Sequence, residues 1–196
     1  MNRAEILSET MWFPHRNRVL SFLPMHGHVC EIGVHKGLFS QEILNHNHPK
    51  KLHLIDCWEK QDAGIYDDSD HNVAQAVQED LYQQVADKFD QQLRSEEVVL
   101  HRQYSTEALP NFEDDYFDWG YIDGNHSYEA CKEDLNLLYP KVKSGGYLVG
   151  HDYLEEKYEP RIGVVQAVHE FIDENDDISF VGITQEKHAT FILKKH

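Results

Sequence analysis

The sequence predicts an α/β fold: one doubly wound, mostly parallel sheet with helices on both faces. Short apolar runs alternate with helical patterns along almost the whole chain, which is typical of repeated strand–helix units. A glycine turn between Gly33 and Gly37 follows the first apolar run, where a strand is expected to pass into a helix. The last two apolar runs are separated by a short polar turn, so they are expected to pair antiparallel. The length of 196 residues fits a single domain, residues 1–196.

Each element follows from the local pattern, in chain order. Residues 1–25 are expected to form an N-terminal helical extension that packs on the edge of the sheet. The apolar runs predict strands at residues 28–33, 51–57, 97–101, 117–123, 147–151, 178–184 and 188–194. Helices are expected at residues 37–45, 73–93, 127–143 and 162–174. Gly145 and Gly146 are expected to end the third of these helices and to open the next strand.

Composition argues against several classes of partner. The formal net charge of −17 disfavours a nucleic acid, because phosphate contacts require clustered lysine and arginine. No apolar run approaches the roughly 20 residues of a membrane span, and the first residues lack the form of a signal peptide. Three cysteines fall in expected buried positions and suit a reducing compartment. We therefore expect a cytoplasmic protein with no nucleic-acid partner and no membrane partner.

The spacing of the glycine turn indicates the kind of cofactor. A dinucleotide fingerprint requires Gly-x-Gly-x-x-Gly, because its second glycine allows a pyrophosphate to contact the backbone. Here the chain has Glu31-x-Gly33-x-x-x-Gly37, and His35 stands at the position of that second glycine. Asp56 ends the next expected strand, and a carboxylate accepts hydrogen bonds from hydroxyl groups. The pattern favours a nucleoside with a cationic amino group and no phosphate, such as S-adenosylmethionine.

With these motifs and the closing hairpin, the chain from about residue 25 onward resembles the class I S-adenosylmethionine-dependent methyltransferases. The resemblance implies a Rossmann-like, doubly wound, seven-stranded sheet in the order 3-2-1-4-5-7-6, with strand 7 antiparallel. It also implies that Glu31, Gly33 and Gly37 hold the methionine end of the cofactor. Asp56 would then bind both ribose hydroxyls.

A third segment, residues 103–109, resembles the stretch that lines the adenine pocket in this family. Ser105 is the candidate cofactor-binding residue there, and it could equally cap the helix that follows. Tyr104 replaces the usual aspartate of this stretch.

The reaction centre is expected where residues 121–129 and 143–153 meet. Both segments resemble motifs of a subgroup of small-molecule O-methyltransferases that includes macrocin O-methyltransferase. Several metal-dependent relatives hold Mg²⁺ at the ends of strands four and five. The matching positions here are Asp123, His151 and Asp152, and Asp123 is expected to serve the cofactor site and the reaction as well.

The histidine leaves two alternatives open at this centre. A bound divalent cation such as Mg²⁺ or Mn²⁺ is one alternative, although imidazole favours Mn²⁺, Fe²⁺ or Zn²⁺ over Mg²⁺. A metal-free site is the other alternative. Without a metal, His126 or His151 could serve as the catalytic general base. Residues 58–70 and 153–161 flank this edge and are expected to form acceptor-binding loops or lids.

Three functions are therefore compared. The leading hypothesis is an S-adenosylmethionine-dependent methyltransferase that acts on an oxygen atom of a small-molecule acceptor. The second is a non-catalytic cofactor-binding or regulatory protein on the same fold, because Tyr104, Asn125 and His151 depart from the family pattern. The third, a nicotinamide oxidoreductase, is disfavoured by His35 in the glycine turn. The sequence does not identify the acceptor, and a homodimer is compatible with it.

Overall fold

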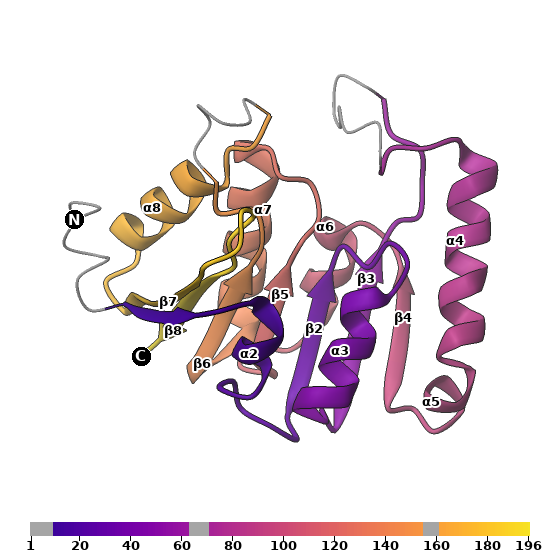
Figure 1. Cartoon of the computed structure of the whole chain (residues 1–196), viewed down its shortest axis with the longest axis horizontal. Helices are drawn as coiled ribbons and strands as arrows, with labels where there is room; N and C mark the ends of the chain where they lie inside the picture. The colour runs from indigo at the N-terminus through magenta and orange to yellow at the C-terminus, as the bar shows by residue number, and fades with distance from the viewer. Residues whose placement is uncertain (1–9, 63–70, 155–160) are drawn as a thin grey trace.

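The alternation of strands and helices builds one sheet with helices packed against it (Figure 1). The computed structural model describes residues 10–62, 71–154 and 161–196, and within them the sheet has eight strands in the order β1-β7-β8-β6-β5-β2-β3-β4. The strands are β1 (Met11–Phe13), β2 (His28–Ile32), β3 (Lys51–Asp56), β4 (Val98–Arg102), β5 (Phe117–Ile122), β6 (Val142–Gly150), β7 (Ile178–Thr184) and β8 (Phe191–Lys195). The helices are α2 (Arg16–Leu20), α3 (Leu38–Asn47), α4 (Gln75–Lys88), α5 (Asp90–Arg94), α6 (Ser105–Ala108), α7 (Tyr128–Leu138) and α8 (Val164–Glu174).

The expected strand order is confirmed for the seven strands that follow residue 25. Strands β4, β3, β2, β5 and β6 are parallel neighbours, and β8 lies antiparallel between β6 and β7. The sheet has one strand more than expected, because β1 pairs parallel with β7 at its outer edge.

The N-terminal segment therefore differs from the helical extension that the sequence predicts. It contains the short helix α2, but Met11–Phe13 forms a strand whose partners are residues 182–184 of β7. Without β1, strand β7 would present unpaired backbone groups at the edge of the sheet. The Phe13 ring packs against Phe22, with ring centroids 5.4 Å apart, and Phe22 packs against Tyr147 of β6 at 5.5 Å, so these contacts hold the segment on the sheet.

Two expected helices end earlier than their apolar patterns suggest. The helix expected at residues 73–93 breaks at Phe89, which is fully buried and leaves helical geometry with a φ of −104°. The helix expected at residues 127–143 ends at Leu138 and passes through a 3₁₀ turn that contains Pro140. Proline cannot donate the backbone hydrogen bond that a continuing helix needs. The next strand begins at Val142, so Gly145 and Gly146 lie inside β6 rather than before it.

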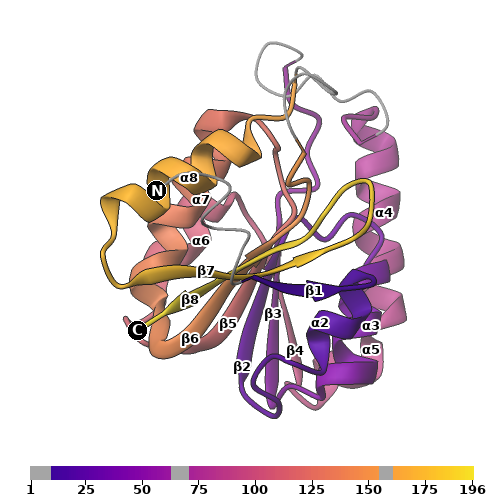
Figure 2. The same ribbon diagram turned by 60° about the vertical axis from the view of Figure 1, so that its left-hand side comes forward.

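Apolar side chains pack on both faces of the sheet and leave its carboxyl edge free for polar residues. In Figure 2, α6, α7 and α8 lie on one side of the sheet and α3, α4 and α5 on the other. Alternate residues of β2 face the two layers, because Cys30 belongs to the same buried cluster as Leu135 of α7, whereas Val29 belongs to the cluster that contains Ile43 of α3. The strand ends then meet in register, since Ile32 lies beside both Ile55 and Ile122.

Parts of the expected acceptor loops, residues 63–70 and 155–160, lie outside the described residues. Among the helices of the described ranges, none combines the length and the apolar composition needed to cross a membrane.

Two histidines on neighbouring strands of the sheet, the buried His53 and the half-buried His101, contact each other. The Nδ1 atom of His53 on β3 lies 2.9 Å from Nε2 of His101, and its Nε2 atom lies 3.2 Å from the hydroxyl oxygen of Tyr116. The His53 side chain is 6% exposed. Burial, followed by the nearby charges of His101 and Lys51, lowers the pKa of His53 to about 3. This imidazole is therefore neutral in the folded protein under ordinary conditions.

We predict that His53 makes the folded state sensitive to acid. The unfolded chain takes up a proton on His53 near pH 6.5, whereas the folded chain does so only near pH 3, so the unfolding free energy falls as the pH drops through this window. Between pH 7 and pH 4.5 the loss should be about 2 to 3 kcal/mol. Measured by urea denaturation, the unfolding free energy of His53→Phe should therefore change less with pH. The control His15→Gln replaces an exposed histidine, and its unfolding free energy should change with pH as it does in the unmodified protein. Equal slopes for His53→Phe and the unmodified protein would contradict this assignment.

Candidate functional site

The glycine turn after β2 brings two strand ends into direct contact. Gly33 has a φ of +86°, and its N–H donates to the carbonyl oxygen of Ile55 at 2.9 Å. A Cβ atom at Gly33 would lie 2.2 Å from the carbonyl oxygen of Asp123. Only glycine therefore allows the backbone after β2 to pass this close to the backbone after β5. Gly37 also has a positive φ of 62° and precedes α3.

Asp56 holds the same turn from the end of β3. Its Oδ2 atom accepts the backbone N–H groups of Val34 and His35, both at 2.9 Å, and its Oδ1 atom accepts the N–H of Trp58 at 2.8 Å. The indole of Trp58 in turn donates to the carbonyl oxygen of His35 at 3.0 Å. The carboxylate that the sequence assigns to the ribose thus also fixes the conformation of the turn.

Glu31 lies behind the turn, and its side chain is 1% exposed. Its Oε2 atom accepts a short hydrogen bond from the Ser40 hydroxyl. Burial raises the pKa of Glu31 to about 8; the Ser40 hydrogen bond opposes this rise, and the charge of Asp123 adds to it. The charge of Arg16 also opposes the rise, but burial outweighs it, so this carboxyl group is largely protonated at neutral pH.

A pocket of about 340 Å³ opens at the carboxyl ends of β2, β3 and β5, beside α6 and α7. Four of the predicted cofactor residues line it: Gly33, Asp56, Ser105 and Asp123. Glu31 and Gly37 are not part of its lining, although Glu31 interacts electrostatically with both Asp56 and Asp123. The volume is typical of sites for small organic ligands.

The lining of the pocket is strongly acidic. Its carboxyl groups are those of Asp56, Glu59, Asp123, Glu133 and Asp134, and no lysine or arginine is among the described residues that line it. Burial raises the pKa of Asp134 to about 7, and a hydrogen bond from Ser105 opposes this rise. The pocket therefore offers acceptors for hydroxyl and ammonium groups and repels phosphates.

Sequence reasoning missed Glu133 and Asp134. The helical pattern of α7 draws attention to its apolar face, in which Leu135 and Leu138 are fully buried, and the acidic residues beside that face read as solvated. Their position in the chain could have indicated them, because the helix that follows β5 must pass along the same edge of the sheet as the turn after β2.

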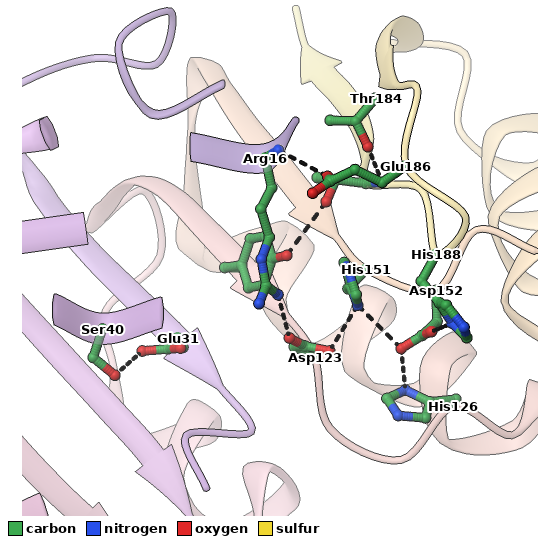
Figure 3. A network of polar contacts seen from close by, with 12 residues as sticks. Arg16, Glu31, Ser40, Asp123, His126, His151, Asp152, Thr184, Glu186 and His188 are labelled. Atoms are coloured by element: carbon green, nitrogen blue, oxygen red, sulfur yellow. Dashed lines mark hydrogen bonds and ion pairs between the residues drawn. The ribbon is translucent and has the colours of Figure 1, made fainter. Parts of the chain in front are cut away.

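Next to the pocket, two carboxylates and two histidines converge at the ends of β5 and β6 (Figure 3). The Nδ1 atom of His151 lies 3.5 Å from Oδ1 of Asp123 and 3.2 Å from Oδ2 of Asp152. The Nδ1 atom of His126 lies 3.3 Å from the same Oδ2 atom of Asp152. The structure thus brings together the sequence-predicted residues Asp123, His126, His151 and Asp152, which we call the edge cluster.

Two further residues contact the edge cluster from outside, and sequence reasoning missed both. Arg16 of α2 places Nη1 3.3 Å from Oδ2 of Asp123, and its backbone N–H donates to Oε2 of Glu186 at 2.8 Å. His188, in the turn between β7 and β8, contacts Oδ1 of Asp152 through its Nδ1 atom. Nothing in the local sequence signals these contacts, because they depend on β1 and the terminal hairpin folding over this edge of the sheet (Figure 3).

The carboxylates change the protonation of the cluster. Burial alone would lower the pKa of His151, but its hydrogen bonds to Asp123 and Asp152 outweigh burial and raise that pKa to about 9. Burial would raise the pKa of Asp152, but the hydrogen bond from His151 and the charge of His126 keep it well below its usual range. His151 is thus a hydrogen-bond donor that bridges two carboxylates.

Comparison with known proteins identifies relatives of this architecture. A family whose description is "Methyltransferase domain" matches residues 30–153. An uncharacterized protein, R132 of Acanthamoeba polyphaga mimivirus, is 38% identical over 66 residues, and the match covers 34% of this chain and 27% of the viral protein. The chain thus spans only about a quarter of that relative's length.

Solved structures share the fold at low sequence identity. The O-methyltransferase TomG from Streptomyces achromogenes, solved with SAM, superposes with a TM-score of 0.65 at 15% identity, covering 91% of this chain and 77% of TomG. A putative methyltransferase from Streptococcus mutans, solved with SAH, gives 0.62 at 12% identity, covering 100% of this chain and 99% of that protein. The N-methyltransferase NodS from Bradyrhizobium japonicum WM9 gives 0.60 at 13% identity, with coverages of 91% and 92%.

We predict that the close approach at Gly33 is essential for stability. Gly33→Ala should lower the unfolding free energy by at least about 3 kcal/mol, because it adds a clash with backbone to the strain of a positive φ. Gly145→Ala is the matched control, since Gly145 has a φ of +82° and no atom within 4 Å of an added Cβ. Its cost should be only about 1 kcal/mol. Chemical denaturation of the two variants measures the difference, and equal losses would refute it.

Proposed function

This chain belongs to the methyltransferase-domain family, and we propose that it transfers a methyl group from S-adenosylmethionine to an oxygen atom of a small-molecule acceptor. The observation that carries the proposal is the acidic pocket beside the glycine turn, directly next to the edge cluster. Two polar sites that share Asp123 suit a reaction between a bound cofactor and a second substrate.

The chemistry of the pocket fits S-adenosylmethionine. The cofactor carries a cationic ammonium group and ribose hydroxyls but no phosphate, and the lining supplies carboxyl groups without lysine or arginine among the described residues. Glu31, Gly33 and Gly37 would hold the methionine end, and Ser105 would lie at the adenine. A cation near Glu31 would favour its ionised form, because opposite charges lower the pKa of a carboxyl group.

Asp56 has room for one further hydrogen bond. Its two oxygens offer about four acceptor sites in total, and three backbone N–H groups already occupy three of them. We therefore expect Asp56 to accept one ribose hydroxyl rather than both. Glu59 lines the same pocket and would accept the other.

When bound, S-adenosylmethionine supplies an electrophilic methyl group on a sulfonium, and the protein must align an acceptor oxygen with it and remove the oxygen's proton. His126 is the candidate base, and Asp152 would stabilise the imidazolium that forms on it. The sequence also offers His151 as a base, but its raised pKa leaves it protonated, so it would act as a hydrogen-bond donor instead. Asp123 would orient the acceptor, because it belongs to both the pocket and the edge cluster.

A divalent cation such as Mg²⁺ or Mn²⁺ is the alternative way to activate the acceptor. Asp123, His151 and Asp152 would hold it, and its charge would lower the pKa of a hydroxyl group. An alcohol or phenol must lose its proton to become a good nucleophile, so the presence of bases or a cation favours oxygen as the acceptor atom. The fold alone does not decide, since NodS is an N-methyltransferase.

The non-catalytic alternative loses part of its support in the structure. Asn125, which departs from the family pattern, accepts the backbone N–H of Ser127 at 3.0 Å through its side-chain oxygen. An aspartate would make the same contact, so this substitution preserves the turn before α7.

Cofactor binding is the first test. Isothermal titration should show that the protein binds S-adenosylhomocysteine, and that Asp56→Ala weakens binding at least about tenfold because a ribose contact and the shape of the turn are lost. Asp114→Asn is the control, since Asp114 is an exposed partner of Lys141 and should bind normally. Absence of binding at millimolar ligand, or unchanged binding by Asp56→Ala, would refute the proposal.

Catalysis is the second test. Methyl transfer to a panel of hydroxylated sugars, catechols and polyketide alcohols should be reduced at least about 100-fold in His126→Gln, whereas binding of S-adenosylhomocysteine should be retained. The exposed His26→Gln is the control and should retain full activity. Normal turnover by His126→Gln would exclude its catalytic role. Tight cofactor binding without transfer to any acceptor would favour the non-catalytic alternative.

A further inference from the structure

We propose that Arg16 is a specificity-determining residue that binds the α-carboxylate of S-adenosylmethionine, so that the protein selects a cofactor with an intact amino-acid end. The inference rests on the proposed function, because that function supplies the cofactor. Arg16 lies outside the family match, which begins at residue 30, so the family motifs assign it no role. It reaches this edge of the sheet through the N-terminal segment, whose strand β1 pairs with β7.

The amino-acid end of the cofactor carries two opposite charges, and the carboxyl groups of the pocket suit only one of them. Five carboxyl groups line the pocket, and they can accept hydrogen bonds from the ammonium group. The same groups repel a carboxylate, and the described lining contains no lysine or arginine to offset them. The α-carboxylate therefore needs backbone N–H groups, an imidazole of His35 or His71 in the lining, or a cation from outside it.

The N–H groups of the glycine turn are largely used to hold its shape. Those of Val34 and His35 both donate to Oδ2 of Asp56 at 2.9 Å. The N–H of Gly37 donates to the carbonyl oxygen of Val34 at 2.8 Å, and that of Gly33 donates to the end of β3 at 2.9 Å. A carboxylate bound to these N–H groups would displace the acceptors that shape the turn, so a side chain is the better partner.

Arg16 lies where the amino-acid end of the cofactor is expected. Its Nη1 atom is 3.3 Å from Oδ2 of Asp123, which lines the pocket, and its charge acts on the carboxyl group of Glu31. Its Cζ atom lies 4.6 Å from the centroid of the Phe39 ring, and the neighbouring Ser40 donates to Glu31. Arg16 and Glu31 thus meet beside the first turn of α3, with Asp123 next to the guanidinium (Figure 3). This arrangement offers acids for the ammonium group and a cation for the carboxylate.

The guanidinium can take a second anionic partner. It has five N–H donors and is charged at every physiological pH, and Asp123 and the Tyr121 hydroxyl use part of this set. The contact with Asp123 is 3.3 Å long, whereas strong charge-assisted hydrogen bonds are about 2.7 to 2.9 Å. The Arg16 side chain is 31% exposed, so a ligand can reach it. The planar guanidinium also matches the geometry of a carboxylate.

Calorimetry of the full-length protein with two ligands tests this assignment. S-adenosylhomocysteine carries the α-carboxylate, and decarboxylated S-adenosylhomocysteine differs only by its loss. The unmodified protein should bind the first ligand at least about tenfold more tightly, because the second loses a charge-assisted contact. Arg16→Met should weaken binding of S-adenosylhomocysteine at least about tenfold and change that of the decarboxylated ligand less than about threefold. Arg16→Lys should recover part of the loss, because it restores the charge without the planar fork.

Arg18→Met is the matched control, because Arg18 is an exposed arginine of the same helix. It should bind both ligands as the unmodified protein does. An equal loss of affinity for both ligands in Arg16→Met would show that Arg16 only orients Asp123, and would overturn the proposal. Selectivity that survives Arg16→Met and disappears in His35→Gln would overturn it as well, because the carboxylate would then meet an imidazole of the lining.

The role of Arg16 and the proposed function fail in different ways. Tight binding of S-adenosylhomocysteine that Arg16→Met leaves unchanged would overturn the role of Arg16 and leave the proposed function intact. If Arg16→Met does not fold, the two affinities of the unmodified protein decide, and equal affinities would overturn the role of Arg16. Absence of S-adenosylhomocysteine binding at millimolar ligand would refute the proposed function and the role of Arg16 with it.

Discussion

The contact between the backbones after β2 and β5 is the constraint on which the site depends. Gly33 lies against the carbonyl of Asp123, and the N–H of Asp123 donates to the carbonyl oxygen of Ile32 at 2.8 Å. Because the two strand ends are joined in this way, the turn that shapes the pocket and the aspartate of the edge cluster cannot move independently. A change at either end of this contact is transmitted to both parts of the site.

Burial of acidic groups is a second property of the site. Glu31 and Asp134 are both nearly inaccessible, and burial raises the pKa of each toward neutrality. Ionising either group in the free protein is unfavourable, because a buried charge loses its hydration. A cationic ligand reduces this penalty, so the site is electrostatically prepared for a positive charge. The edge cluster differs, because histidines and Arg16 surround its carboxylates.

Much of the fold and part of the site could be predicted from the sequence. The alternation of apolar runs predicts the mostly parallel sheet, and the family resemblance supplies the strand order. The carboxyl ends of parallel strands necessarily share one edge. That rule alone is enough to place Asp56, Asp123 and Asp152 at the same edge of the sheet. It does not predict which hydrogen-bond donors each carboxylate contacts. The three backbone partners of Asp56 arise from the path of the turn, which no local pattern specifies.

The features that could not be predicted are tertiary. A three-residue strand such as β1 has too short a pattern to recognise, and its pairing depends on the free edge of β7. Arg16 and His188 enter the site only through that pairing and the terminal hairpin. The break at Phe89 likewise results from its burial against Gly37, which outweighs the helical pattern around it.

The pairing of β1 with β7 has a consequence for the order in which the molecule matures. Pocket residues lie between positions 32 and 134, so all of them leave the ribosome before the terminal hairpin is synthesised. The hydrogen bond from Arg16 to Glu186 joins residues 170 positions apart, and His188 follows two residues later. The pocket residues of a nascent chain are therefore available before the edge cluster receives its contacts from Glu186 and His188, and those contacts require the closing of a long loop.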